Sequence, residues 1–247
     1  MIDIIIGTVT GLIWGSFMGV VKSRLDDPKS IFWGRSECPK CKKTLGVFDL
    51  IPIISFLALR GKCRYCKKPI APSHLAVEIL SAILAVAVYT IFGLNIASIF
   101  LYLSLSFLLV ASLSDIENQE VDVVFFVLGI ATAIIFKMLS HLSFESIIYG
   151  AITFTLIPFL LYLVSREKWM GMGDTFFALW AGILVGFPQS LPMVFVAFFL
   201  GAVFGIIKLL AGASSHRIAF GPFLAFSAVL GVFWSKTVLD CYLSIFY

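Results

Sequence analysis

Four cysteines of this 247-residue chain are arranged in two closely spaced pairs inside a basic segment. The pairs are Cys38-Pro-Lys-Cys41 and Cys63-Arg-Tyr-Cys66, with 21 residues between them. Two such turns suit tetrahedral zinc, because each delivers two thiolates to one ion and four thiolates leave no open coordination position. The spacing therefore predicts a structural zinc site formed by Cys38, Cys41, Cys63 and Cys66, with disulfide bonds as the alternative.

Two aspartates stand at the ends of apolar stretches, where an ionisable side chain is costly. Asp115 ends one stretch, and Asp174 opens another directly after Gly171-Met172-Gly173. A helix N-terminal cap is the plain structural interpretation of Asp174. The chemical interpretation is a carboxylate pair that shares one proton, so that one member takes a proton from water while the other hydrogen-bonds the scissile carbonyl. The aspartates thus predict an aspartic-protease site with Asp115 and Asp174 as catalytic residues.

The composition of the chain determines what kind of scaffold must position these groups. Hydrophobic residues make up 60% of the sequence, charged residues only 13%, and phenylalanine alone contributes 25 residues. Soluble domains are about 45–50% apolar and about 25% charged, so a single soluble domain could not bury this much apolar surface. The composition excludes a secreted disulfide scaffold, a disordered regulator and an ordinary cytosolic enzyme. It predicts an all-α polytopic membrane protein.

Eight apolar stretches account for the predicted membrane domain. They cover roughly residues 4–21, 74–92, 96–114, 121–139, 144–164, 174–187, 189–210 and 219–240. The sixth is short: fourteen residues reach roughly 21 Å as a helix, less than a ~30 Å hydrocarbon core. The ten apolar residues at 50–59 cannot span and predict a helix at the interface or packed on the basic module. The predicted organisation is a first transmembrane helix (1–21), a zinc module (22–72) and a seven-helix membrane domain (73–247).

The distribution of basic residues predicts the orientation of these spans. Residues 22–72 hold twelve lysines and arginines against four acidic residues, so this loop is expected in the cytoplasm. With eight spans, the turns near 115–122, 165–173 and 211–218 then fall on the same side. Lys137 and Lys236 are the two bases left outside, and both termini are expected outside. Asp115 and Asp174 would face the cytoplasm together with the zinc module.

The turn after the third span is acidic. It contains Asp115, Glu117, Glu120 and Asp122 with no basic residue among them. Such a rim would attract a basic peptide segment, whereas an ordinary solvated turn is the alternative.

In this order along the chain, the motifs resemble those of the bacterial type IV prepilin peptidases, which are leader peptidases and N-methyltransferases. The resemblance covers nearly the whole chain and rests on Gly15-Ser16-Phe17 with Arg24-Leu25, the paired cysteines, Asp49-Leu50-Ile51-Pro52, Arg60-Gly61-Lys62, Glu78, Asp115, Gly171-Met172-Gly173-Asp174 and Phe220-Gly221-Pro222-Phe223-Leu224-Ala225. The chain departs from the family pattern at three places. Glu120-Val121-Asp122 stands where Leu-Pro-Asp is usual, Phe176 where lysine is usual, and Gly19 where asparagine is expected.

The resemblance implies cleavage of type IV prepilin or pseudopilin precursors at the cytoplasmic face of the bacterial inner membrane. Cleavage would fall after a glycine and before a usually phenylalanine residue, removing a basic leader. The new N-terminus would then be methylated from S-adenosylmethionine, although no residue of a methyl-donor site can be assigned. The expected partners are the precursor and membrane lipid, with no nucleic acid, and the oligomeric state stays open. Glu78 could serve methyl transfer or pair with an arginine such as Arg24.

Three alternatives remain at this point. One is a peptidase of the same family without methyl transfer. Another is a signal-peptide-peptidase-like Gly-x-Gly-Asp protease, although such proteins carry a late Pro-Ala-Leu element and no cysteine tetrad. The third is a zinc-sensing or scaffold protein whose aspartates only cap helices.

Overall fold

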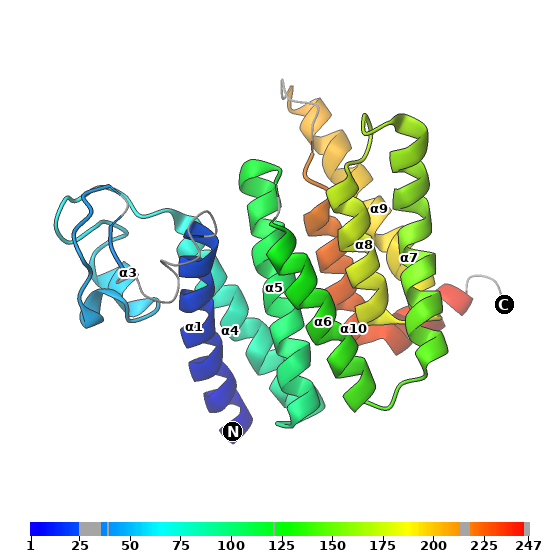
Figure 1. The fold of residues 1–247 in the computed structure, drawn as a ribbon, viewed down its shortest axis with the longest axis horizontal. Coiled ribbons are helices and arrows are strands. Elements are labelled where there is room, and N and C mark those ends of the chain that lie inside the picture. The colour runs from blue at the N-terminus through cyan, green and yellow to red at the C-terminus, as the bar shows by residue number, and fades with distance from the viewer. Residues whose placement is uncertain (25–35, 39, 121, 213–217, 245–247) are drawn as a thin grey trace. The chain divides into compact units, whose positions relative to one another are not determined.

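The computed structural model describes residues 1–24, 36–38, 40–120, 122–212 and 218–244, and the chain divides into two compact units, Met1–Ser98 and Ile99–Tyr247. Leu25, Val121, most of the turn predicted at 211–218 and the side chain of Lys236 lie outside the described residues. Figure 1 shows the helices in chain order. Each unit is described by itself.

All eight predicted stretches form helices, and their ends lie within a few residues of the expected positions. The helices are α1 (Ile2–Ser23), α4 (Pro72–Phe92), α5 (Ile96–Asn118), α6 (Val123–Leu139), α7 (Phe144–Ser165), α8 (Met172–Val185), α9 (Ser190–Leu210) and α10 (Gly221–Ser244). Five of them, α1, α4, α5, α7 and α9, are long and apolar enough to cross a membrane. The helices α6, α8 and the first part of α10 are apolar but shorter. The chain is therefore an all-helical, multi-pass membrane protein.

In the first unit, α1 and α4 pack closely because α1 carries a glycine at every fourth position. A Cβ atom added at Gly7, Gly11 or Gly15 would lie 2.5–2.9 Å from a backbone Cα of α4. The three partners occur in the reverse order, at residues 86, 82 and 78, so the two helices run antiparallel. Small residues that let two backbones approach are the usual means of packing helices in lipid, where apolar burial gives little driving force.

The insertion between the cysteine pairs contains less helix than expected. A 3₁₀ turn, η1 (Val47–Asp49), is followed by α3 (Ile54–Ala58), which has only five residues. A helix is disfavoured at residue 51, because Pro52 restricts the backbone of the residue before it. Ile53 then takes a left-handed φ of 62°. The apolar stretch at 50–59 is therefore a turn and a short helix rather than one ten-residue helix.

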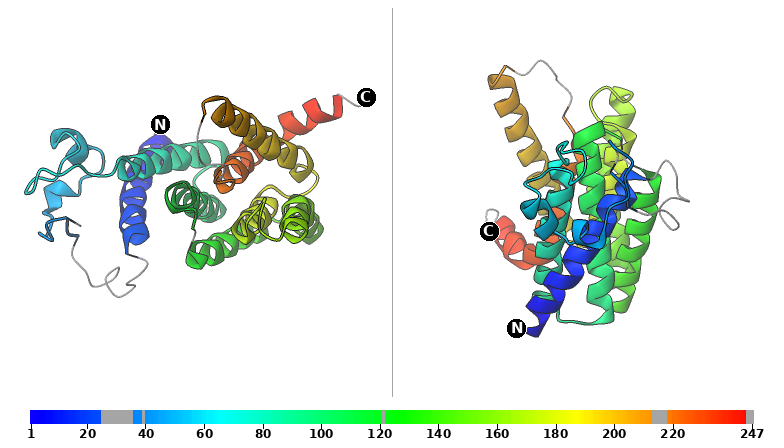
Figure 2. Two further views of the ribbon diagram at one scale, coloured as in Figure 1. Left: turned by 90° about the horizontal axis from the view of Figure 1, so that it is seen from above. Right: turned by 90° about the vertical axis from the view of Figure 1, so that its left-hand side faces the viewer.

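In the second unit, α8 lies between α6 and α7 and also contacts α10 (Figure 1), while α9 lies beside α10 (Figure 2). A buried polar chain fixes this arrangement. The indole Nε1–H of Trp180 on α8 donates to Ser104 Oγ at 2.9 Å, and this hydroxyl donates to the carbonyl of Gly129 on α6 at 2.8 Å. The ring of Trp180 occupies the space that a Cβ atom at Gly129 would need. The helix that carries Asp174 is thus held in a specific register.

Candidate functional site

The four predicted cysteine ligands come together in the first unit. Their sulfur atoms all lie within 4.8 Å of one another, and Cys38 Sγ is 3.9 Å from Cys66 Sγ. A tetrahedral zinc with Zn–S bonds of about 2.3 Å places its sulfurs about 3.8 Å apart. The cysteines are free thiols, so the disulfide alternative is not realised. The residues therefore fit a four-thiolate metal ion.

The two cysteine turns have the same backbone structure. In each, the first cysteine donates its N–H to the carbonyl five residues later and accepts at its own carbonyl from the N–H four residues later. The residue after the second cysteine has a left-handed φ, 57° at Lys42 and 56° at Lys67. The sequence already indicates that the two turns are equivalent, because both read Cys-x-x-Cys-Lys-Lys. The prediction from ligand spacing used only the cysteines of this repeat.

The turns also favour thiolate over thiol at one ligand. The backbone N–H groups of Cys41 and Lys40 hydrogen-bond the Cys38 sulfur and lower the pKa of this thiol to about 6. A thiolate is the form that binds a metal ion. The fold of the first turn thus prepares Cys38 for coordination at neutral pH.

Two further contacts join the cysteine turns to the rest of the first unit. Arg64, inside the second turn, pairs with Asp49 at 2.6 Å, and the other oxygen of Asp49 accepts the N–H of Gly46. The backbone N–H of Ile53 donates to Glu78 Oε2 on α4 at 2.8 Å. The two residues of each contact are distant in the chain, so the spacing of residues in the sequence could not predict the contact. Glu78 accepts the N–H of the residue before α3 and so joins α3 to α4.

The two predicted aspartates lie in the second unit, both half-buried. Asp115 belongs to the last turn of α5, and Asp174 is the third residue of α8. Gly171, rather than Asp174, is the N-cap residue of α8, and Asp174 Oδ2 accepts its N–H at 3.2 Å. Asp174 therefore contributes to capping, as the plain interpretation expects, but from inside the helix.

Both carboxylates meet at the first residue of α10. The N–H of Gly221 donates to Asp115 Oδ2 at 3.1 Å and is also close enough to the Asp174 carboxylate to favour its charge, and the two carboxylates interact electrostatically. The next residue, Pro222, has no N–H, so Gly221 supplies the donor at this helix start. Two aspartates with 58 residues between them are thus brought together at the start of α10.

A glycine is required at position 221 by the close approach of its neighbours. A Cβ atom there would lie 2.5 Å from the ring of Phe177 and 2.7 Å from Asp115 Oδ2. In the sequence, Gly221 was notable only as part of the family resemblance. Its role as a hydrogen-bond donor at the aspartates was not predicted. A Gly-Pro pair opening a helix was the available signal.

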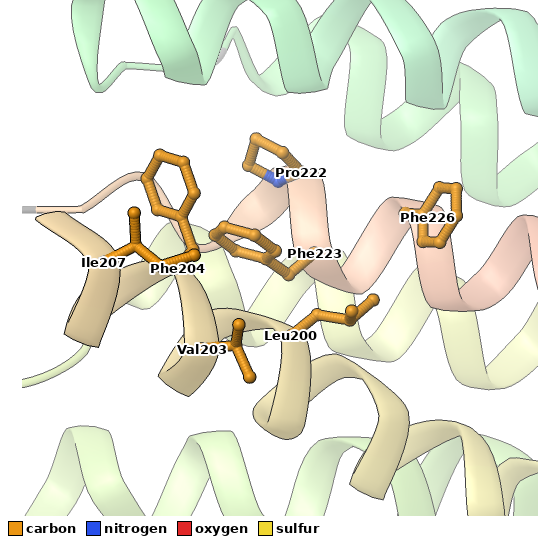
Figure 3. A pocket seen from close by; sticks show the side chains of 7 residues that line it. All are labelled: Leu200, Val203, Phe204, Ile207, Pro222, Phe223 and Phe226. Atoms are coloured by element: carbon orange, nitrogen blue, oxygen red, sulfur yellow. The ribbon is translucent and has the colours of Figure 1, made fainter.

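An apolar groove begins directly beyond this residue, between α9 and α10 (Figure 3). It encloses about 360 Å³. Its lining is entirely apolar and consists of Leu200, Val203, Phe204, Ile207, Pro222, Phe223 and Phe226. Pro222, which lines the groove, directly follows Gly221, the hydrogen-bond donor to Asp115.

The similarity to known protein families extends over most of each unit. Residues 9–92 match the model of the bacterial peptidase A24 N-terminal domain, and residues 102–206 match that of the type IV leader peptidase family. No solved structure gives a significant match.

Several curated proteins are similar over nearly their whole length. A prepilin leader peptidase/N-methyltransferase of Bacillus subtilis is 29% identical over 95% of this chain and 96% of its own length. The type 4 prepilin-like proteins leader peptide-processing enzyme of Escherichia coli is 30% identical over 93% of both chains. A prepilin leader peptidase/N-methyltransferase of Pseudomonas aeruginosa is 28% identical over 94% of this chain and 91% of its own. Because the match extends through the cysteine turns and both aspartates, this chain belongs to the type IV leader peptidase family.

Proposed function

We propose that the chain is an aspartic endopeptidase that removes the basic leader of type IV prepilin-like precursors and then N-methylates the new N-terminus. The observation that carries the proposal is the meeting of Asp115 and Asp174 at the N–H of Gly221. Membership of the leader peptidase family and the names of the relatives support both activities.

Two adjacent carboxylates supply the acid and the base for peptide hydrolysis. Like charges at short range disfavour double ionisation, so the pair retains one proton. The ionised member takes a proton from water, which attacks the scissile carbonyl, while the protonated member hydrogen-bonds the carbonyl oxygen. The Gly221 N–H holds one carboxylate in place as the charge moves. The proton gained from water then passes to the leaving amine.

The acidic turn supports recognition of a basic leader. Glu117, Glu120 and Asp122 are exposed and follow Asp115 directly in the chain. A positively charged leader would be attracted to this rim, which would hold its cleavage point near the aspartates. Replacing Glu117 and Glu120 by glutamine should therefore raise KM for a basic-leader substrate.

The groove of Figure 3 supports a substrate with an apolar residue after the cleavage point, as in a Gly–Phe junction. It opens at the residue next to Gly221 and offers only apolar side chains. Narrowing it with Val203→Trp should slow cleavage of a Gly–Phe substrate more than that of a Gly–Ala substrate, because the smaller side chain needs less room.

The membrane arrangement proposed is eight spans, with the zinc module (22–72) and the active site facing the cytoplasm and both termini outside. The fourteen-residue length of α8 supports access of water to Asp174, since a short span thins the bilayer locally. The four-thiolate geometry supports zinc as the metal, held by Cys38, Cys41, Cys63 and Cys66 in a structural role. The proposed location is the inner membrane of a bacterium.

The test uses purified protein in detergent with a synthetic precursor that has a basic leader and a Gly–Phe junction. Mass spectrometry should detect cleavage after the glycine. With S-adenosylmethionine present, the product should gain the mass of one methyl group. Absence of cleavage would overturn the peptidase proposal. Cleavage without the methyl group would leave a peptidase that lacks the second activity.

A further inference from the structure

The insertion between the cysteine turns presents large apolar side chains to its surroundings. Val47 and Phe48 of η1 are 80% and 77% exposed, and Ile54 and Leu57 of α3 are 63% and 65% exposed. These four residues are referred to as the apolar edge. Apolar side chains gathered on the surface of a polar module mark a binding surface.

The same module carries a strong positive charge. Within the described part of residues 36–70, eight basic side chains are exposed: Lys40, Lys42, Lys43, Arg60, Lys62, Arg64, Lys67 and Lys68. The two acidic residues of this part are already paired, Glu37 with Lys42 at 3.4 Å and Asp49 with Arg64 at 2.6 Å. Eight bases less these two acids leave six positive charges in the described part of the module, and a four-thiolate zinc centre would lower this excess to about four.

A hydrogen bond fixes the apolar edge beside a membrane-crossing helix. Ile53, the residue before α3, donates its N–H to Glu78 on α4 at 2.8 Å. Glu78 lies six residues after Pro72, the first residue of α4, which corresponds to about 9 Å along the helix. Since α4 is long and apolar enough to span, a contact this close to its first residue joins α3 to one end of the span.

We propose that the apolar edge inserts into the membrane interface and that the basic side chains around it bind anionic phospholipid head groups. Apolar insertion combined with surrounding lysines and arginines is the combination by which interfacial segments bind anionic membranes. The charge favours anionic lipid over a neutral membrane, and the anchoring to α4 favours lipid over a soluble partner. This surface belongs to the first unit and the aspartates to the second, and the proposal does not depend on the proposed peptidase activity.

The test places a fluorescent reporter on the apolar edge of the full-length protein. Phe48→Trp is reconstituted in nanodiscs of phosphatidylcholine with or without phosphatidylglycerol, with bromine atoms on the acyl chains as quencher. The signal of the native chain is subtracted. Thr44→Trp, at an exposed and uncharged residue beside the first cysteine turn and outside the apolar edge, is the matched control. We expect quenching of F48W to exceed that of T44W by about twofold or more, and to increase with phosphatidylglycerol.

The role of charge is tested with the triple variant Lys62→Gln, Lys67→Gln and Lys68→Gln in the F48W protein. The increase caused by phosphatidylglycerol should be lost, and high salt should have the same effect on F48W itself. Equal quenching of F48W and T44W would overturn the insertion, and equal quenching of F48W in both lipid mixtures would overturn the preference for anionic lipid. Protection of the four cysteines from a thiol reagent shows that the module is intact. If F48W fails this check, Leu57→Trp replaces it.

Discussion

The two regions of the molecule that carry chemical groups are constructed differently. The cysteine cluster takes its four sulfur atoms from 29 consecutive residues, and each half is a turn closed by its own backbone hydrogen bonds. The carboxylate site takes Asp115, Asp174 and Gly221 from three helices, α5, α8 and α10, and no local turn joins them. A site formed by local turns depends on its own segment, whereas a site formed between helices depends on the packing of the whole unit. Substitutions in one region should therefore leave the other unchanged.

The largest expected effect is at the aspartates. Asp115→Asn and Asp174→Asn should each lower kcat by roughly 10²–10⁴-fold, because an amide can neither take nor donate the proton that hydrolysis requires. At position 174 the amide oxygen can still accept the N–H of Gly171, so α8 should keep its cap. Peptide cleavage by mass spectrometry gives the rate, and metal analysis should show the cysteine site unchanged. Full cleavage activity of both variants would show that the two aspartates have only a structural role.

The second-largest effect on cleavage is expected at Gly221. Gly221→Ala should lower cleavage by about 10²-fold, since its Cβ would displace Phe177 or the Asp115 carboxylate and small displacements at reacting groups are costly. Gly205→Ala in α9 is the control, because its added carbon lies at an ordinary distance of 3.4 Å from Ile218. Equal activities of the two variants would show that Gly221 does not position the aspartate.

Substitution of a cysteine should affect mainly the first unit. Cys63→Ser should lower the bound metal and accelerate hydrogen exchange in residues 36–70, because binding of a structural metal ion supplies folding free energy. Tyr65→Phe changes the same turn without removing a ligand and should keep the metal. Cleavage should fall less than in D174N, and exchange in α5, α8 and α10 should not change. Faster exchange in those helices would show that the two regions are coupled.

The smallest effect is expected at the link between the cysteine module and α4. Glu78→Gln keeps a hydrogen-bond acceptor for the Ile53 N–H but removes its charge, which should lower the local opening free energy by about 1 kcal/mol. Hydrogen exchange at the Ile53 amide measures this change. Glu145→Gln, an exposed residue at the start of α7, should leave that amide unaffected. An unchanged exchange rate in the Glu78 variant would show that the contact does not hold α3.

Much of the fold was predictable because the apolar stretches are local signals. The predicted start of the fourth span at residue 121 and the observed start of α6 at Val123 differ by two residues, and the prediction for α7 was as close. The insertion was less predictable, since a left-handed residue such as Ile53 is held by a contact to a distant helix. The glycines of α1 were visible in the sequence, but their partners on α4 depend on the antiparallel pairing of two helices.

By itself, the sequence determined where the helices form and which four cysteines lie together. Both follow from interactions between residues close in the chain: apolar runs that lipid stabilises as helices, and short turns that present pairs of thiolates. Only the tertiary structure decided that Asp115 and Asp174 meet at the N–H of Gly221, and that Glu78 serves as an acceptor for Ile53. Such contacts depend on the register in which whole helices pack, which is set by many side chains at once, as at Trp180, Ser104 and Gly129.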